Sequence, residues 1–138
     1  MFDHCLYFNT TALARRLERE WTAAFKPFGL TPSQAFLLRV VLAKPGLLQR
    51  ELAEEMGISR PTTTRALDGL VAKGLVVREA SQRDGREWSI APTNKATALH
   101  RDLDAASGTV TKRLKRLLGE GAFVETVAKV RDVRAHLK

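Results

Sequence analysis

The side chains from Ser59 to Arg65 have the chemistry that reads bases in a DNA groove. Arginine can bridge O6 and N7 of guanine, and threonine can donate a hydrogen bond, accept one or touch a thymine methyl group. A serine hydroxyl and the free N–H groups of a helix's first turn can hold a phosphate. We therefore expect DNA contacts from residues at the start of one helix: Ser59, Arg60, Pro61, Thr62, Thr64 and Arg65. The alternative is an ordinary solvated helix face.

A second basic cluster surrounds an Asp84-Gly85 pair, with Arg83 before it and Arg86 after it. A narrow minor groove has an enhanced negative potential that attracts arginine, most of all at A/T-rich steps. Asp-Gly by itself signals only a hairpin turn, so a polar turn without a partner is the alternative. We expect Arg83, Asp84 and Arg86 to belong to the DNA-binding surface.

Gln49 and Arg50 stand at the predicted start of a short helix. Polar and basic side chains at such a position can face the phosphate backbone. Contacts of this kind position a protein on DNA without reading its sequence. We expect this role for both residues, although exposed charge at a helix start is common.

Cys5 is the single cysteine of the chain, and it precedes the first predicted helix beside His4. A helix N-terminus or a nearby cation lowers the pKa of a thiol and favours a thiolate that reacts with peroxide. The alternative is a small, buried and inert side chain. Because the chain has no second cysteine to resolve an oxidised thiol, a thiol peroxidase is a weaker interpretation.

The composition fits one soluble domain that needs neither disulfides nor metal, since 44% of its 138 residues are hydrophobic. One cysteine and three scattered histidines provide no metal-binding cluster, and no motif for a catalytic nucleophile, a carboxylate pair or a phosphate loop occurs. We expect no metal, no cofactor and no enzyme. Without a membrane-spanning apolar run or a basic secretory start, the expected location is the cytoplasm.

The net charge of +8 favours a polyanionic partner. The excess is concentrated near the end of the chain, where residues 110–138 carry eight basic and three acidic side chains. DNA is one such partner. The alternative is a protein–protein interaction module that grips an acidic protein with these basic segments.

Apolar residues at helical spacing predict six helices. The first carries Leu13, Leu17, Trp21, Phe25 and Phe28 on one face and ends at Gly29. A capping box, with Thr31 as cap, Pro32 next and Gln34 reaching back, begins the second. The third covers about 49–56 and the fourth runs from Ser59 to about Lys73, with Ala66, Leu67, Leu70 and Val71 facing inward. Thr93 caps a long fifth helix, and Gly119 and Gly121 separate it from a sixth.

Between the fourth and fifth helices the apolar period changes from 3.6 to 2, which indicates strands. Leu75–Ala80 and Arg86–Ala91 are the two candidates, and Trp88 and Ile90 share one face. Two helices around a tight Gly57 turn, followed by a hairpin with a basic tip, predict a winged helix-turn-helix. The expected fold class is therefore mainly α with a small β-hairpin wing.

From about Cys5 to Arg101 the chain resembles the MarR-type (multiple antibiotic resistance) winged-helix regulators. The resemblance rests on the order and spacing of several short motifs: Leu30-Thr31-Pro32, Glu51-Leu52-Ala53, Leu67-Asp68-Gly69-Leu70, Lys73-Gly74-Leu75-Val76, and the wing residues Asp84, Arg86 and Thr93. The chain departs from the family pattern at Leu48, where a Ser or Thr usually caps the third helix, and at Pro92 and Ala96.

This resemblance implies a transcription regulator, more often a repressor, that binds double-stranded DNA as a homodimer. In the family, the arginine that matches Arg86 enters the minor groove and the aspartate that matches Asp84 orients the loop. One branch senses organic hydroperoxides through an N-terminal cysteine comparable to Cys5, but its sulfur-bonding tyrosines are missing from residues 31–36 here. Other members often bind small aromatic acids.

We expect three regions in one compact chain: an N-terminal dimerisation helix in residues 1–30, a winged helix-turn-helix in 31–92, and C-terminal dimerisation helices in 93–138. Two heads on one two-fold axis require a pseudo-palindromic operator with half-sites about 10 bp apart. A small aromatic effector or an oxidant would release the protein from this operator. The expected effector or redox site is a cavity between the dimerisation region and the heads, lined by Cys5, Tyr7, Phe8, Ala12, Phe36 and Val40.

Overall fold

The structure, a computed structural model, describes residues 1–137 and consists of helices with one two-stranded antiparallel sheet. The elements in chain order are α1 (Leu6–Phe25), the 3-10 turn η1 (Lys26–Phe28), α2 (Pro32–Ala43), α3 (Gln49–Met56), α4 (Arg60–Ala72), β1 (Val76–Ala80), β2 (Trp88–Pro92), α5 (Asn94–Leu118) and α6 (Glu120–His136). The predicted winged helix-turn-helix is confirmed.

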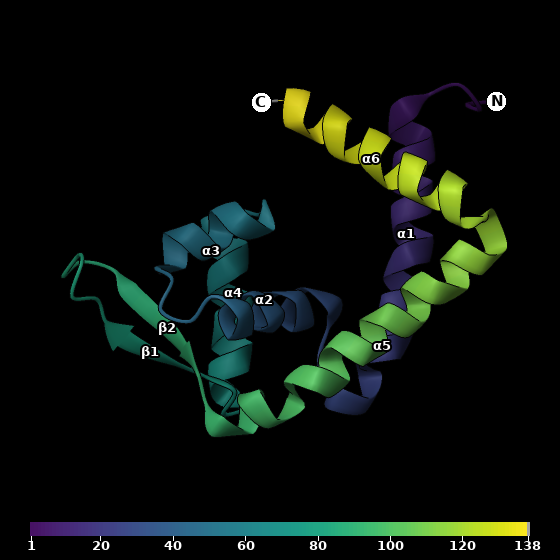
Figure 1. Ribbon diagram of the computed structural model, residues 1–138. Helices are drawn as coiled ribbons and strands as arrows, with labels where there is room; N and C mark the ends of the chain where they lie inside the picture. Colours follow the sequence, from purple (N-terminus) through teal and green to yellow (C-terminus); the bar gives the residue numbers. More distant parts are fainter. Residues whose placement is uncertain (138) are drawn as a thin grey trace.

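The elements form a head and a separate helical region that α5 connects (Figure 1). The head contains α2, α3, α4 and the hairpin. α5 leaves the end of β2, packs along α2 and α1, and leads into α6. The start of α1 and the end of α6 both lie away from the hairpin (Figure 1).

The hydrophobic core lies where α2, α4, β2 and the end of α1 meet. Its completely buried side chains include Phe25, Leu37, Leu38, Val41, Leu52, Leu67, Leu70, Ile90 and Leu103. Leu103 brings α5 into the same cluster. The head and the first half of α5 thus share one core, so the head cannot tilt on α5 without disturbing that packing.

The helix starts follow the local signals of the sequence. Thr31 accepts the N–H of Gln34, and the Gln34 side chain accepts the N–H of Thr31, which completes the predicted capping box. Ser59 and Thr93 cap α4 and α5 in the same way by accepting an N–H three residues on. The predicted cap residues are confirmed.

Three local expectations are wrong. The first helix ends at Phe25, because Pro27 lacks a backbone N–H and the chain tightens into η1. Val71 is 38% exposed although it was expected to face inward; at about 100° per residue it lies about 70° from the mean direction of Thr63, Leu67 and Leu70. Gly121 does not mark a break, since only Gly119 interrupts the helices and α6 resumes at Glu120.

Polar contacts join α5 to α1 and α2. The Trp21 indole Nε1–H donates to the Ser107 hydroxyl at 3.0 Å, and Arg113 pairs with Glu20. The Arg39 guanidinium lies 2.8 Å from an oxygen of Asp104. No helix within residues 1–137 combines the length and the apolar character needed to cross a bilayer.

Gly69 allows α2 and α4 to approach closely. A Cβ built there would overlap the amide nitrogen of Gln34, the residue whose side-chain oxygen caps α2. We expect Gly69→Ala to lose its usual helical gain of about 1 kcal/mol, because the displaced Gln34 no longer caps the helix. In a Gln34→Ala background the same substitution should stabilise the protein by about 1 kcal/mol. Urea unfolding of the four variants measures this coupling, and additive effects would contradict the contact.

Candidate nucleic-acid interface

The turn between α3 and α4 contains a residue in the left-handed backbone conformation. Gly57 has φ +64°, a conformation that favours glycine, and Ile58 donates its N–H back to the Ala53 carbonyl at 3.2 Å. Two residues later α4 begins at Arg60. The turn leaves one face of the N-terminal half of α4 exposed, with Arg60, Pro61 and Arg65, while Ala66, Leu67 and Leu70 are buried as expected.

The first turns of α4 present arginines to solvent and hold threonines in place. Of the residues expected to contact DNA, Arg60, Pro61 and Arg65 are exposed, whereas Thr62 and Thr64 are half-buried. Their hydroxyls are already engaged, Thr62 with Ser59 at 2.9 Å and Thr64 with the Arg60 carbonyl at 3.0 Å. The Arg65 guanidinium lies 3.3 Å from the Thr62 hydroxyl. Arg60 and Arg65 are the side chains that can extend furthest from this face.

Gln49 connects α3 to α4. Its side-chain amide donates to the Thr64 hydroxyl at 2.7 Å, so two predicted DNA-binding residues satisfy each other in the free protein. Arg50, beside it, is exposed and directed to solvent. The start of α3 is thus fixed against the face of α4 that carries Arg65.

The hairpin pairs Val76 with Pro92 and Ala80 with Trp88, which leaves a seven-residue loop from Ser81 to Glu87 as the wing tip. Ile90 is fully buried, whereas Trp88 on the same face is 50% exposed because it lies beyond the core. β1 starts one residue later than expected and ends at Ala80 as expected, whereas β2 starts two residues later and ends one residue later. The tip is longer than a two-residue turn.

Asp84 shapes the wing tip. Its carboxylate accepts the backbone N–H of Arg86 at 3.0 Å, and its carbonyl accepts the N–H of Glu87 at 3.1 Å. The buried Ser81 hydroxyl accepts the N–H groups of Arg83 and Asp84 at 3.1 and 3.2 Å. Arg86 is exposed at the tip and forms no ion pair within residues 1–137.

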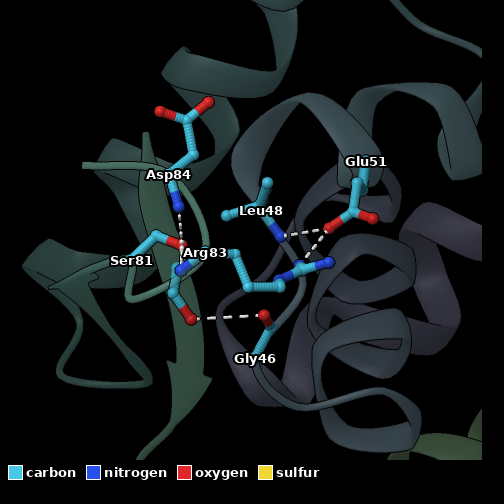
Figure 2. A network of polar contacts seen from close by, with 7 residues as sticks. Gly46, Leu48, Glu51, Ser81, Arg83 and Asp84 are labelled. Atoms are coloured by element: carbon cyan, nitrogen blue, oxygen red, sulfur yellow. Dashed lines mark hydrogen bonds and ion pairs between the residues drawn. The ribbon is translucent and has the colours of Figure 1, made fainter. Parts of the chain in front are cut away.

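Arg83 points away from the tip toward α3, where its Nη2 lies 2.5 Å from Glu51 Oε1 (Figure 2). The same oxygen accepts the N–H of Leu48 at 2.8 Å. α3 therefore begins at Gln49 although Leu48 has no capping side chain, because Glu51 supplies the second half of a capping box. Sequence reasoning missed Glu51, and its position three residues after Leu48 was the signal that could have found it.

The Arg83 hydrogen bond, followed by that of the Leu48 N–H, holds the pKa of Glu51 below its ordinary value. A carboxyl whose pKa is lowered by folding contributes stability above its unfolded-state pKa, and this contribution is lost as the pH falls through its folded-state pKa. The contribution of Glu51 is therefore present at neutral pH and is lost only on acidification.

The six residues expected around one effector or redox cavity do not meet within one subunit. Cys5 caps α1, and the Phe8 N–H lies 3.5 Å from its sulfur. Phe36 instead packs edge-on against Phe25 at the other end of α1, with ring centroids 5.9 Å apart. Twenty helical steps separate Cys5 from Phe25, a span of about 30 Å. The expectation ignored the length of α1. Tyr7, Phe8 and Ala12 belong to the first half of that helix, which Cys5 precedes, whereas Phe36 and Val40 belong to α2.

Two open clefts flank Phe36. One, of about 380 Å³, lies between α2, α3 and α5 and is lined by Phe36, Arg39, Val40 and His100 among others. The other, of about 410 Å³, lies between α1, α2 and α3. The Arg39 guanidinium stands 5.1 Å from the centre of the Phe36 ring, and Asp104 holds it there. The positively charged guanidinium of Arg39 thus lies beside the aromatic ring of Phe36.

The fold and this surface define a winged helix-turn-helix protein, and comparison with known proteins identifies the class. The sequence model of the MarR family matches residues 28–87. A protein of Thauera aromatica described as a transcriptional regulatory protein for the hcr operon is 31% identical, over 87% of this chain and 86% of its own length. The chain belongs to the MarR family of transcriptional regulators.

Solved structures agree with this assignment. The transcriptional repressor CouR bound to a 23-mer DNA duplex superimposes with a TM-score of 0.89 and 28% identity, covering 96% of this chain and 94% of CouR. The fold is also that of the PcaV regulator of Streptomyces coelicolor in complex with its natural ligand, with a TM-score of 0.79, 24% identity and coverage of 91% and 92%.

Proposed function

We propose that this chain is a homodimeric repressor that binds a pseudo-palindromic operator and is released by a small molecule. The observation that carries the proposal is the continuous connection of α4, α3 and the wing through the Gln49–Thr64 and Glu51–Arg83 contacts. These contacts fix the three elements that would meet DNA relative to one another. The fold is that of CouR, whose solved structure contains a 23-mer DNA duplex.

On DNA, α4 would enter the major groove with Arg60 and Arg65 directed at base edges. Ser59 and the free N–H groups of the first turn, together with Gln49 and Arg50, would hold phosphates. Arg86, exposed at the wing tip, would enter the adjacent minor groove.

Unpaired apolar surface supports the dimer. Large hydrophobic side chains are exposed on the start of α1, the end of α5 and along α6: Leu6, Tyr7, Phe8, Leu13, Leu117, Leu118, Val124, Val127, Val130 and Val133. α6 buries none of its own residues. A second copy is the partner that covers such a surface in a closed two-fold assembly. The regions 1–30 and 93–138 would then form the dimerisation part around the head, 31–92.

The clefts beside Phe36 are the best candidate effector site. A small aromatic acid could place its ring on Phe36 and its carboxylate on Arg39, competing with Asp104. Since Arg39 belongs to α2 and Asp104 to α5, this competition would alter the link between head and dimerisation region and favour a different head spacing. PcaV, which shares the fold, holds its natural ligand in the solved structure.

Selection of bound sites from random duplex DNA by the full chain tests the proposed function. We expect a palindrome whose half-sites are centred about 10 bp apart, and an affinity that falls steeply with salt as phosphate counterions are released. If no sequence is enriched, the chain acts instead as a protein–protein module for an acidic partner.

Oxidation of Cys5 is a second candidate for the release signal, because the sulfur is exposed at a helix start and accepts the Phe8 N–H. A hydroperoxide would oxidise the thiol to a sulfenic acid and be reduced to the alcohol. Cys5→Ser should then keep DNA binding in the reduced state and lose release by hydroperoxide. Operator binding by both proteins, with and without peroxide and after added reductant, measures this. Equal release of the variant would exclude the redox signal.

A further inference from the structure

Arg83 is held at both ends, unlike Arg86 three residues later. Its backbone N–H donates to the Ser81 hydroxyl at 3.1 Å, and Ser81 is itself buried. Its guanidinium reaches Glu51 on α3 (Figure 2). A side chain engaged in this way is directed toward the protein and its charge is balanced by a carboxylate.

Glu51 is anchored with equal firmness, since the same carboxylate oxygen accepts the Leu48 N–H at 2.8 Å. Leu48 in turn forms a β-bridge with Ser89 of β2. The neighbouring Ile90 N–H donates to the Leu47 carbonyl at 2.9 Å. The contacts therefore form a closed ring, from the wing loop through Glu51 to the residues before α3 and back along β2 to the wing loop.

We propose that Arg83 is a positioning residue that, through Glu51, sets the wing against α3, and that it does not itself contact DNA. This inference rests on the proposed DNA binding and goes beyond it by assigning different roles to the two wing arginines, Arg83 and Arg86. Arg86 remains free to enter the groove. Arg83 fixes where the tip carrying Arg86 stands relative to α4, and its charge, balanced by Glu51, adds no phosphate contact.

The test replaces the ion pair by a neutral pair, Glu51→Gln with Arg83→Gln, so that the net charge of the protein does not change. The amide oxygen that takes the place of the carboxylate can still accept the Leu48 N–H and cap α3. Binding to a duplex selected by the wild type and to a random duplex is measured between low and moderate salt. The salt slope is the slope of the logarithm of the binding constant against the logarithm of the salt concentration. We expect the slope of the variant to equal that of the wild type, because no phosphate contact is lost. The preference for the selected duplex should fall about fivefold, because the wing is no longer fixed.

Two controls calibrate the measurement. Arg86→Ala should lower the slope by about 0.9, which shows that the loss of one cation is resolved. Neutralising the other ion pair of α3, Lys44→Gln with Glu55→Gln, should change neither slope nor preference, because that pair of 3.0 Å joins α3 to the residue that follows α2 and not to the wing. Circular dichroism confirms that each variant is folded.

The outcomes separate the inference from the proposed function. A slope that falls by about 0.9 in the neutral-pair variant would make Arg83 a phosphate contact and overturn the inference. Unchanged slope with unchanged preference would overturn it too, since the pair would then position nothing. A wild-type protein that shows no salt-dependent duplex binding would instead reject the proposed function.

Discussion

Arg65→Ala is expected to weaken binding to the selected operator by about 1–3 kcal/mol and to relax the preference at one base-pair position in each half-site. Arg65 is exposed on the uncovered face of α4, and its guanidinium is oriented by the Thr62 hydroxyl at 3.3 Å. An arginine oriented from a recognition helix can form two hydrogen bonds to one guanine, and these disappear with the side chain.

The measurement is a titration of operators that each carry one substituted base pair, with the wild type and the variant side by side. Arg101→Ala is the matched control, because it removes one exposed arginine from α5, outside the head. If Arg65→Ala loses as much affinity for random DNA as for the operator, Arg65 contacts only phosphate.

Removal of residues 119–138 should have a larger effect and leave the protein as a monomer or an aggregate. The deletion takes away α6 with its exposed valines and leaves the exposed Leu117 and Leu118 at the end of α5 without the apolar surface of α6 beside them in the interface. A monomer carries one head and loses the gain from two linked binding events, which is about 10²–10⁴-fold in operator affinity. Sedimentation velocity and operator titration give the two results.

The substitution Val130→Asp tests the same interface as the deletion with a single changed side chain. Val130 is half-exposed in the isolated subunit, so a carboxylate there leaves the fold intact while opposing burial in an interface. We expect a folded monomer with weak operator binding. A dimer that persists in both variants would show that α6 lies outside the interface.

Local signals predicted the fold because the contacts that start each helix are local. Thr31, Ser59 and Thr93 each accept an N–H three residues away, so the cap and its partner can be recognised together in the sequence. The two strands were recognised from their period, and their bounds shifted by one or two residues because register depends on packing against the core.

The site was less predictable because its contacts are long-range. Arg83 was expected to face DNA, yet its partner Glu51 lies 32 residues earlier and no spacing rule connects them. The expectation that the effector residues line one cavity was wrong for a related reason. Cys5 lies just before α1 and Phe36 lies 11 residues after its last residue, and the 20-residue length of this helix holds them apart.

The two tryptophans lie at the proposed DNA-binding wing and at the proposed effector cleft, and would give the protein two intrinsic optical reporters. Trp88 is half-exposed on the wing strand, so its fluorescence would respond to DNA docking. Trp21 donates a hydrogen bond to Ser107 where α1 packs against α5, and it also lines a cleft beside Phe36. Its fluorescence would therefore change when an effector binds in that cleft. Single-tryptophan forms with phenylalanine at the other position would let the arrival of an effector and the departure from DNA be timed separately in one stopped-flow experiment.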